Sequence, residues 1–572
     1  MLKDNIYENG IILSQLKVGV VSTVTAQYIK VNLAFSGQVS GKYIWGRRYG
    51  KGEVGEFVLV EGQQSICLGR ITEIKLPERD RTELSQEFDG SNDLDAIGYI
   101  QLLGTISREN LKVQAGVAEY PRLGDRVFSA PVDLIASIPE LMGAGDRSKN
   151  SVMIELGSVT GGVGGKIKVT PEKLFGRHCA VLGATGGGKS WTITKLLEEC
   201  ARFKGSKLLL LDATSEYRNL DPLYTEHWHI GAPIHKHEAS IELQIPPTDF
   251  IESDFIAMFD PSGKVQSPKL REAIKSLRLV ELEPEIFPNG VVEKVGKEKK
   301  DYRRALNKNN NSSLVDNPSQ PFDVSNLAKQ IVQECCWDNG DSWGNANNDL
   351  GHCSSLLTRI QSVINSASLK AVFKADADLK NFSDAFKEFW ESDKKIFRIC
   401  LSDISYEFNA REVLANVIGR SLLKKAREDY FRKKPLITVV DEAHNFLGKR
   451  VGSEDNSTRL DSFELIAKEG RKYGLNILLA TQRPRDITEG VISQMGTLLV
   501  HRLTNERDRD VVEKACGEID RSAASFLPNL QQGELAVVGV DFPIPMTIQI
   551  DPPASPPASD GASFQSSWVE DT

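Results

Sequence analysis

The strongest chemical signal in this sequence is a phosphate-binding pattern, G-x-x-x-x-G-K-[ST], which a chain of this length matches by chance about 2 times in 100. Here it reads Gly183, Ala184, Thr185, Gly186, Gly187, Gly188, Lys189, Ser190. The glycines let backbone N–H groups surround the α- and β-phosphates, Lys189 reaches the β/γ oxygens, and Ser190 supplies a Mg²⁺ ligand. The apolar run 180–182 precedes the pattern and a helix-forming run, 191–203, follows it. The sequence therefore predicts binding of ATP and Mg²⁺.

An acidic pair supplies the matching hydrolytic chemistry. The apolar, β-branched run 436–440 ends in Asp441-Glu442-Ala443-His444, as expected for a buried parallel strand that delivers carboxylates at its carboxyl end. We expect Asp441 to hold Mg²⁺, directly or through water, and Glu442 to polarise the attacking water. The alternative is an acidic N-cap of the next helix, and the phosphate-binding pattern elsewhere in the chain disfavours it.

Two further strand ends carry polar residues. Gln482 follows the predicted strand 475–481 and is placed to sense the γ-phosphate, or else is a polar turn residue before Pro484. Asp212 follows the predicted strand 208–211 and precedes Glu216-Tyr217. These carboxylates either line the same edge, supporting Mg²⁺ or basic groups, or cap the end of the strand.

Three arginines are candidates for a finger that neutralises transition-state charge on a neighbouring subunit. Arg471 lies just before the predicted sensor strand, and Arg177 and Arg483 compete with it. Each has a structural salt bridge as its alternative role. A finger acting in trans implies an oligomer.

Histidine and cysteine clusters are weaker signals. His227, His229, His235 and His237 lie close together, but no cysteine or carboxylate completes a recognised zinc spacing. The adjacent Cys335 and Cys336 favour buried packing over redox chemistry.

Composition restricts the class of protein. With 572 residues the chain is too long for one hydrophobic core. A net charge of −8 argues against an overall basic coat for nucleic acid, so any DNA contact is expected to be local, as in a channel. The eight cysteines show no CxxC pair, and neither a signal peptide nor an apolar run long enough for a membrane span is evident. We expect a cytoplasmic protein without a membrane partner.

The pattern of apolar residues predicts an α/β protein with several parts. Short β-runs between 18 and 128 suggest a small barrel, followed by a Gly-rich hinge at 161–165. Strand–helix alternation after it indicates a mainly parallel sheet. The polar insertion, with its asparagine run 307–311, predicts helices and one mobile loop, and the proline-rich end predicts a tail. The predicted domains are residues 1–165 (barrel), 166–246 with 392–550 (ATPase core), 247–391 (helical insertion) and 551–572 (flexible tail).

Together these motifs resemble the HerA family of FtsK-like hexameric ATPases. The resemblance covers about residues 10–550 and rests on GRH before GATGGGKS, Asp212 through Glu216-Tyr217, DEAHNF at 441–446, and EGRKYG followed by ATQRP. It implies an N-terminal HAS-barrel, a RecA-like P-loop ATPase core with a helical insertion, and a homohexameric ring that threads double-stranded DNA. By the same resemblance, Lys189, Ser190, Asp441, Glu442, Gln482 and, most loosely, Arg471 occupy motif positions. A charged loop at 448–459 departs from the family pattern.

Two functions remain open on the sequence. The first is an ATP-driven DNA translocase or helicase, and the second is a nucleotide-controlled ring scaffold that activates an effector without productive translocation. Every carboxylate constellation that the motifs justify is used for ATP hydrolysis, so no nuclease metal site remains. The resemblance then implies a partner docked on the barrel face, namely a NurA-like nuclease, a defence endonuclease or a sirtuin-like effector, in DNA processing or anti-phage defence.

Overall fold

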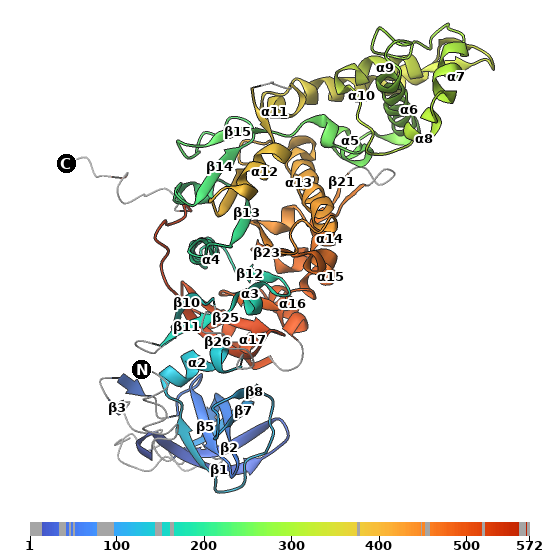
Figure 1. The fold of residues 1–572 in the computed structure, drawn as a ribbon. Coiled ribbons are helices and arrows are strands. Elements are labelled where there is room, and N and C mark those ends of the chain that lie inside the picture. The colour runs from blue at the N-terminus through green and yellow to red at the C-terminus, as the bar shows by residue number, and fades with distance from the viewer. Residues whose placement is uncertain are drawn as a thin grey trace. The chain divides into compact units, whose positions relative to one another are not determined.

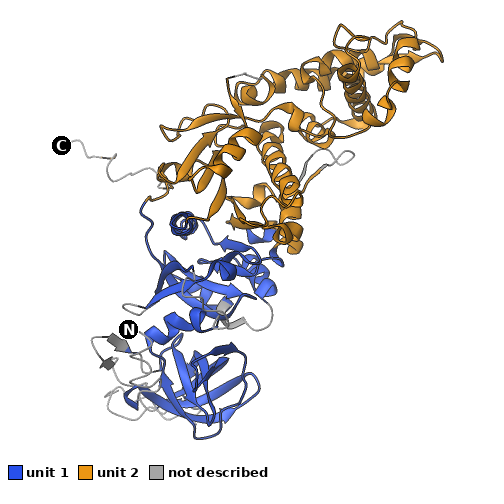
Figure 2. Ribbon diagram, in the orientation of Figure 1, with its two compact units in different colours: residues 1–203, 482–485, 492–554 blue, residues 204–481, 486–491, 555–572 orange. Residues whose placement is uncertain are grey.

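The computed structural model describes residues 14–33, 42–44, 47–49, 52–76, 96–142, 152–160, 165–374, 378–447, 449–451, 458–516, 521–559 and 568. The chain divides into two compact units (Figure 2). Unit 1 comprises residues 1–203, 482–485 and 492–554, and unit 2 comprises residues 204–481, 486–491 and 555–572.

The first part of unit 1 is an antiparallel β-barrel. Its strands are β1 (Lys17–Val24), β2 (Tyr28–Leu33), β5 (Phe57–Glu61), β6 (Ser65–Lys75), β7 (Ala96–Ser107) and β9 (Arg126–Ser129). The order is β2-β1-β9-β5-β6-β7, and pairing of β7 with β2 closes the barrel, with β8 (Val113–Ala115) added outside β7. Alternate residues of β2, namely Ile29, Val31 and Leu33, are fully buried because successive side chains of a strand point to opposite faces. The predicted small barrel is confirmed.

The second part of unit 1 is a six-stranded sheet ordered β11-β10-β26-β25-β24-β12. Its strands are β10 (Ile154–Val159), β11 (Lys166–Val169), β12 (Cys179–Leu182), β24 (Thr497–Val500), β25 (Glu534–Gly539) and β26 (Phe542–Ile550). Only β12 and β24 run parallel, and the remaining pairs are antiparallel. The helices of this part are α2 (Val132–Met142), α3 (Pro171–Phe175), α4 (Lys189–Ala201), α16 (Glu506–Cys516) and α17 (Arg521–Phe526). Most of the predicted Gly-rich hinge, 161–164, lies outside the described residues.

Unit 2 contains a parallel sheet ordered β23-β20-β13-β19-β14-β15-β18. Its strands are β13 (Lys207–Asp212), β14 (Thr225–His229), β15 (Ile241–Gln244), β18 (Lys380–Asn381), β19 (Ile396–Cys400), β20 (Leu436–Val440) and β23 (Leu475–Thr481). Every residue of β13, β19 and β23 is buried, which explains why these segments are mostly apolar and do not alternate with polar residues. The helices α13 (Ala410–Arg427) and α14 (Ser462–Glu469) pack beside this sheet (Figure 1). The predicted parallel α/β sheet is confirmed.

A helical insertion extends from this sheet, as predicted (Figure 1). Its helices are α5 (Glu252–Phe259), α6 (Gly263–Leu282), α7 (Lys300–Asn307), α8 (Asn311–Leu314), α9 (Leu327–Glu334), α10 (Asp349–Ile364), α11 (Lys370–Phe373) and α12 (Phe382–Glu391), with the hairpin β16 (Cys336–Asp338) and β17 (Trp343–Ala346). The asparagine run forms a closed turn rather than a loose loop, because the buried Asn311 amide donates to Glu283 and to the carbonyl of Ala305.

Two segments differ in detail from the predicted pattern. The described ends of the charged loop pair as an antiparallel hairpin, β21 (Lys449–Val451) with β22 (Thr458–Leu460). The first residues of the predicted tail make contacts: Asp551 pairs with Lys166, and the backbone N–H of Ala558 donates to the carbonyl of Glu216. Among the described residues, no helix combines the length and the apolar character that a membrane crossing requires.

Candidate nucleotide-binding and hydrolysis site

The phosphate loop has the predicted setting within unit 1. The buried strand β12 ends at Leu182, the loop 183–190 turns, and α4 begins at Lys189. Gly186 and Gly188 adopt φ values of 73° and 106°, a left-handed region that side chains with a Cβ rarely enter. The Lys189 ammonium lies over the loop and donates to the carbonyl of Ala184 at 3.1 Å. A lysine and the exposed N–H groups of a helix start are the chemistry that binds phosphate oxygens.

His501 supports the phosphate loop from within the core of unit 1. It follows β24, the strand parallel to β12, and its backbone N–H donates to the carbonyl of Leu182 at 2.7 Å. The ring is fully buried, with Nδ1 2.9 Å from the carbonyl of Glu534 and Nε2 2.9 Å from the Thr192 hydroxyl. Because a carbonyl only accepts, Nδ1 carries the proton and Thr192 donates to Nε2. Burial lowers the pKa of His501 to about 4, so the ring is neutral at pH 7.

The loop glycines are required by this histidine as well as by phosphate. A Cβ on Gly183 would lie 2.6 Å from Cβ of His501, and a Cβ on Gly188 would lie 3.2 Å from its Cε1. The sequence analysis missed His501. Its only sequence signal is a polar residue directly after the apolar run 497–500, the same signal that marked Gln482.

Gln482 reaches the phosphate loop within unit 1. Its side-chain oxygen accepts a hydrogen bond from the Thr185 hydroxyl. The structure thus brings together two of the predicted site residues from distant parts of the chain. The sensing role of Gln482 stays a prediction, and the contact gives it a direct route to the loop that would hold the phosphates.

The acidic pair belongs to unit 2, at the carboxyl end of β20. Asp441 is 4% exposed, and its carboxylate accepts the backbone N–H of Glu442 at 2.9 Å. Burial, then the charges of Glu442 and Glu216, raise the pKa of Asp441 well above its usual range. Carboxylate oxygens are the ligands that a hard divalent cation prefers, so the chemistry of the Asp441 side chain suits Mg²⁺. Ser190, the other predicted ligand, belongs to unit 1, and the shared ligation stays a prediction.

The Glu442 carboxylate has neighbours that orient it. The backbone of Glu442 is left-handed, with φ 47°, and this turns the chain sharply at the end of the strand. His444 Nδ1 lies 3.4 Å from the Glu442 carboxylate and 3.2 Å from the hydroxyl of Thr481, the last residue of β23. The imidazole of His444 thus lies beside the Glu442 carboxylate at the strand end, where a general base for water is expected.

Asp212 forms a buried ion pair. It and Arg398 are both fully buried, and Nε of the guanidinium donates to the carboxylate at 2.8 Å. The same carboxylate accepts the backbone N–H groups of Thr214, Glu216 and Tyr217. Asp212 therefore makes contacts that fit both predicted alternatives, because it pairs with a basic group and also caps the turn after its strand. Arg398, on β19, was not identified from the sequence, because its partner lies 186 positions away in the chain.

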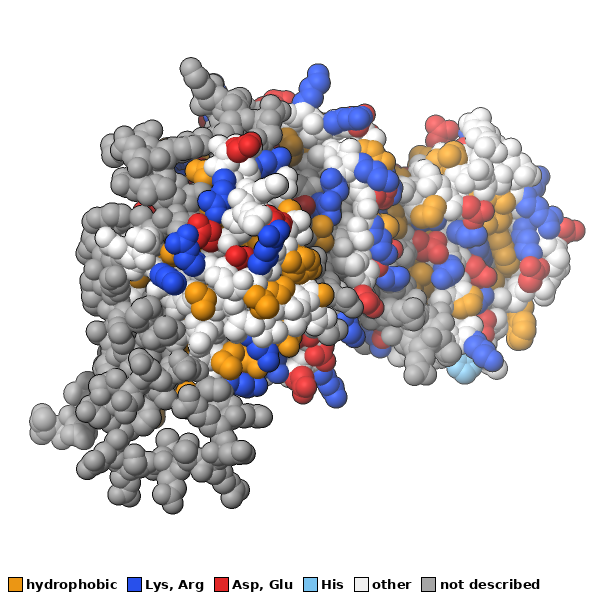
Figure 3. All heavy atoms as spheres, turned by 90° about the horizontal axis from the view of Figure 1, so that it is seen from below, with side chains coloured by type: hydrophobic (Ala, Val, Ile, Leu, Met, Phe, Trp, Pro, Cys, Tyr) orange, Lys and Arg blue, Asp and Glu red, His pale blue; other side chains and the backbone are white. Residues whose placement is uncertain are grey.

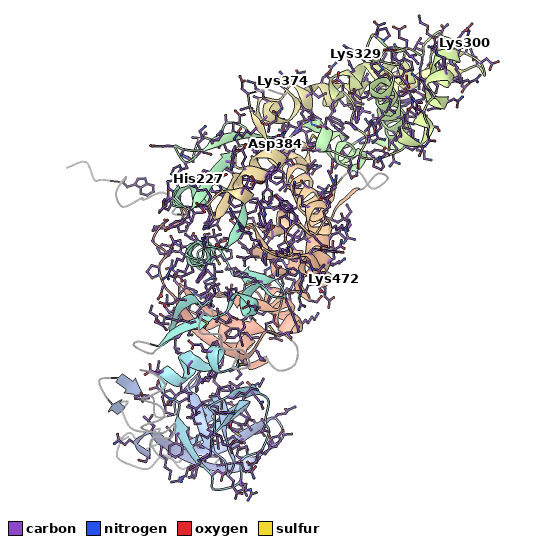
Figure 4. All side chains as sticks on the ribbon, viewed as in Figure 1. His227, Lys300, Lys329, Lys374, Asp384 and Lys472 are labelled. Carbon is purple, nitrogen blue, oxygen red and sulfur yellow. The ribbon has the colours of Figure 1, made fainter. Side chains whose placement is uncertain are left out.

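The three candidate finger arginines have different surroundings. Arg471 lies on the exposed 3₁₀ turn Gly470–Tyr473 of unit 2, beside Lys472, which is labelled in Figure 4. Arg177 of unit 1 lies 3.4 Å from the Asp541 carboxylate, which favours its structural alternative. Arg483 is exposed. Arg471 and Arg483 are both exposed, and a role in trans for either stays a prediction.

In the histidine-rich segment 227–237, the histidine rings take part in packing and hydrogen bonds. His227, on β14 (Figure 4), stacks on His237 with ring centroids 4.2 Å apart and bonds to the carbonyl of Leu220. His229 bonds to the Ser240 hydroxyl and to Lys236. Among the described residues, no group of three or more His, Cys, Asp or Glu side chains is arranged for a metal ion. Cys335 is buried and uncrosslinked.

Comparison with known proteins completes this picture. The family described as "Helicase HerA, central domain" matches residues 154–334. The matched segment includes the phosphate loop in its strand–loop–helix setting, and together these findings support an ATP hydrolase.

The similarity to HerA proteins extends beyond that domain. The chain is 22% identical over 510 residues to "DNA double-strand break repair helicase HerA" of Sulfurisphaera tokodaii, covering 87% of this chain and 88% of that protein. It is 25% identical over 468 residues to "Probable helicase MJECL08" of Methanocaldococcus jannaschii, covering 80% of each. The solved structure of VirB4 of Thermoanaerobacter pseudethanolicus aligns with a TM-score of 0.43 and 15% identity, covering 71% of this chain and 98% of that one.

Proposed function

We propose that this HerA-like chain is an ATP-driven DNA translocase or helicase that acts as a homohexamer with an effector partner. The observation that carries the proposal is the pair of half-sites: a phosphate loop braced by His501 and Gln482 in unit 1, and an orientated carboxylate pair in unit 2. HerA relatives bear the name helicase over most of the chain. The proposal is that residues of both groups act on the same nucleotide.

The residues divide the chemistry of hydrolysis among them. Lys189 and the loop N–H groups bind the phosphates, with Gly183 to Ser190 forming the cradle. Ser190 and Asp441 would hold Mg²⁺, which neutralises charge on the phosphates when bound. Glu442 accepts a proton from the attacking water and Gln482 orients that water or the γ-phosphate. The finger contributed by a neighbouring subunit is Arg471.

DNA binding is expected in the pore of the ring rather than on the outside. On the described part of the face in Figure 3, basic and acidic side chains are interspersed and form no broad basic field. The net charge of −8 agrees with that pattern. A ring concentrates a few basic groups from each subunit into one channel, where they track phosphates without sequence preference.

The decisive experiment measures ATP hydrolysis with and without long duplex DNA, and displacement of a third strand from a triplex. A translocase shows DNA-stimulated hydrolysis and displacement, and both disappear in Glu442→Gln. Stimulated hydrolysis without displacement supports the second function, a nucleotide-controlled scaffold. A rate of ATP hydrolysis that does not change with DNA, together with no displacement of the third strand, contradicts the translocase.

The trans finger is tested by mixing subunits. Arg471→Ala rings and Glu442→Gln rings are each expected to be inactive, and mixed rings are expected to regain activity at interfaces that pair an intact finger with an intact site. Lys472→Ala, at the adjacent exposed position, is the matched control and is expected to keep full activity. A fully active monomer, or no recovery on mixing, contradicts the arrangement.

The effector is proposed to be a NurA-like nuclease, a defence endonuclease or a sirtuin-like enzyme docked on the barrel, in DNA processing or anti-phage defence. The barrel presents exposed apolar side chains, including Tyr120 at 47% and Leu123 at 70% exposure. Co-expression with the adjacent reading frame, followed by purification through one tag, tests the docking. Leu123→Asp is expected to abolish co-purification, while Leu223→Asp, 65% exposed in unit 2, retains it. Equal recovery with both variants, or DNA degradation by the ring alone, contradicts the model.

A further inference from the structure

A hollow of about 290 Å³ opens beside the phosphate loop in unit 1. One wall comes from Gly188 and Trp191 at the start of α4, and the other from residues just before β25 and at the end of β26. The second wall includes Gln532, Gly533 and Gln549. Gly188 belongs both to the phosphate loop and to the lining of the hollow, so the hollow borders the loop.

Trp191 supplies an aromatic face to this hollow. The next two residues of α4, Thr192 and Ile193, are fully buried, whereas Trp191 remains 37% exposed at the turn of the helix that follows the phosphate loop. An aromatic side chain at the edge of a cavity offers a flat surface on which a nucleobase stacks, and every base has a matching π face.

Two amides supply polar groups on the opposite wall. Gln532 and Gln549 are both exposed. Gly533, between them in space, has φ 78°, and a Cβ there would lie 2.6 Å from Nε2 of Gln549, so the glycine makes room for the amide. The N–H of Ile550 donates to the carbonyl of Gly533 at 3.0 Å and fixes the two strand ends together. A carboxamide both donates and accepts, which suits the mixed edge of a purine.

We propose that this hollow is the base subsite of the nucleotide site, with a purine stacked on Trp191 and read by Gln532 and Gln549. The inference rests on the proposed function, because it requires phosphates on Gly183 to Ser190. Whole small-molecule pockets measure about 300–1,000 Å³, so a hollow of about 290 Å³ suits one part of a ligand rather than all of it. Its mixed lining of apolar surface with a few polar groups is typical of such pockets.

The charged residue at the rim does not compete for the base. Asp551 also lines the hollow, but its carboxylate lies 2.6 Å from the Lys166 ammonium. Its charge is therefore balanced within the protein, and the neutral amides remain the groups that select the base. Affinity for the base thus depends on Trp191, and discrimination between purines depends on the two glutamines.

The test compares ATP with inorganic tripolyphosphate as ligands of the full-length protein, by calorimetry in the presence of Mg²⁺. Trp191→Ala is expected to weaken ATP binding about 10-fold or more and to leave tripolyphosphate binding unchanged, because only the base is lost from its contacts. Trp191→Phe retains a stacking face and is expected to restore most of the affinity. Trp337→Ala, 60% exposed on β16, is the matched control without effect. Gln532→Ala with Gln549→Ala is expected to narrow the ratio of ATP to GTP affinity.

The outcomes separate the subsite from the proposed function. Unchanged ATP affinity in Trp191→Ala, or an equal loss for ATP and tripolyphosphate, overturns the base subsite while leaving the P-loop ATPase intact. If the ratio of ATP to GTP affinity is unchanged in the variant with Gln532→Ala and Gln549→Ala, the two amides do not select the base. Absence of ATP binding in the wild-type protein overturns the proposed function and the subsite together.

Discussion

The phosphate loop of unit 1 and the carboxylate pair of unit 2 are stabilised in opposite ways. The phosphate loop is braced by neutral hydrogen bonds among His501, Thr192 and the carbonyl of Glu534, with Lys189 as the local charge. The carboxylate half gathers Asp441, Glu442 and Glu216, whose mutual repulsion and burial raise the pKa of Asp441. The phosphate loop therefore suits an anion, and the carboxylate region concentrates negative charge.

The contrast between the phosphate loop and the carboxylate pair predicts different roles for them in catalysis. A loop whose hydrogen bonds are already made spends little free energy on rearrangement when phosphate arrives. A cluster of crowded carboxylates gains most of its stability only when Mg²⁺ and nucleotide enter. Variants of the two halves should therefore fail in distinguishable ways.

The largest expected effect separates binding from hydrolysis. Lys189→Ala is expected to abolish tight ATP binding, because the loop loses its charge. Glu442→Gln is expected to keep ATP affinity and to reduce kcat by about 10²–10⁴-fold, because the water loses its base. Calorimetric binding and steady-state turnover measure both. Equal affinity in Lys189→Ala and wild type, or unchanged turnover in Glu442→Gln, would refute the assignment.

The buried ion pair of unit 2 should give the next largest effect. Asp212→Asn leaves the Arg398 guanidinium buried without its counter-charge, at a cost of about 3–5 kcal/mol in the free energy of unfolding. Asp341→Asn removes the partner of Arg303 from an exposed pair and is expected to change stability little, since its side chain is 96% exposed. Urea denaturation compares the two. Similar losses of unfolding free energy in both variants would show that the buried pair stabilises the protein no more than the exposed pair does.

His501, which supports the phosphate loop, is expected to make the stability of the protein depend on pH. Its folded pKa of about 4 lies below the unfolded value of about 6.5, so the unfolded state binds more protons between these values. The stability that His501 contributes is present above pH 6.5 and is lost as the pH falls toward 4. His501→Gln is expected to remove up to about 3 kcal/mol of that pH dependence. The rest of the pH dependence includes contributions from His227 and His229 of unit 2. Burial lowers their pKa values to about 3 and about 4.

The measurement is urea denaturation of wild type and His501→Gln at several pH values between 4 and 7. His352→Gln, at an exposed position of α10, serves as the control and is expected to keep the wild-type pH dependence. An identical slope in all three proteins would exclude His501 as a contributor.

The smallest expected effect concerns the cation. Without Mg²⁺, Asp441→Asn relieves carboxylate repulsion and is expected to raise the melting temperature by a few degrees, about 1 kcal/mol. With Mg²⁺ and nucleotide, the wild-type melting temperature is expected to rise and that of the variant to stay nearly constant. Thermal unfolding followed by circular dichroism tests both arms. A variant that is destabilised without Mg²⁺ would mean that the carboxylate cluster is not under charge strain.

The sequence by itself determined the elements and the motif chemistry. The barrel strands, the parallel apolar strands β13, β19, β20 and β23, and the helical insertion follow from local periodicity and run length, because burial on one face or on both leaves a direct trace in the residue pattern. The phosphate loop and the acidic pair were readable because their chemistry requires particular residues at short, regular spacing. Their catalytic roles remain predictions.

Only the tertiary structure decided which distant residues meet. The contacts Gln482 with Thr185, His501 with Thr192, and Asp212 with Arg398 join positions 297, 309 and 186 residues apart. No local pattern records such pairs, because a buried polar group is satisfied by whichever partner the packing of strands brings within hydrogen-bond distance. For the same reason the sequence left Asp212 between two roles, and the structure shows contacts of both kinds, with the Arg398 guanidinium and with backbone N–H groups.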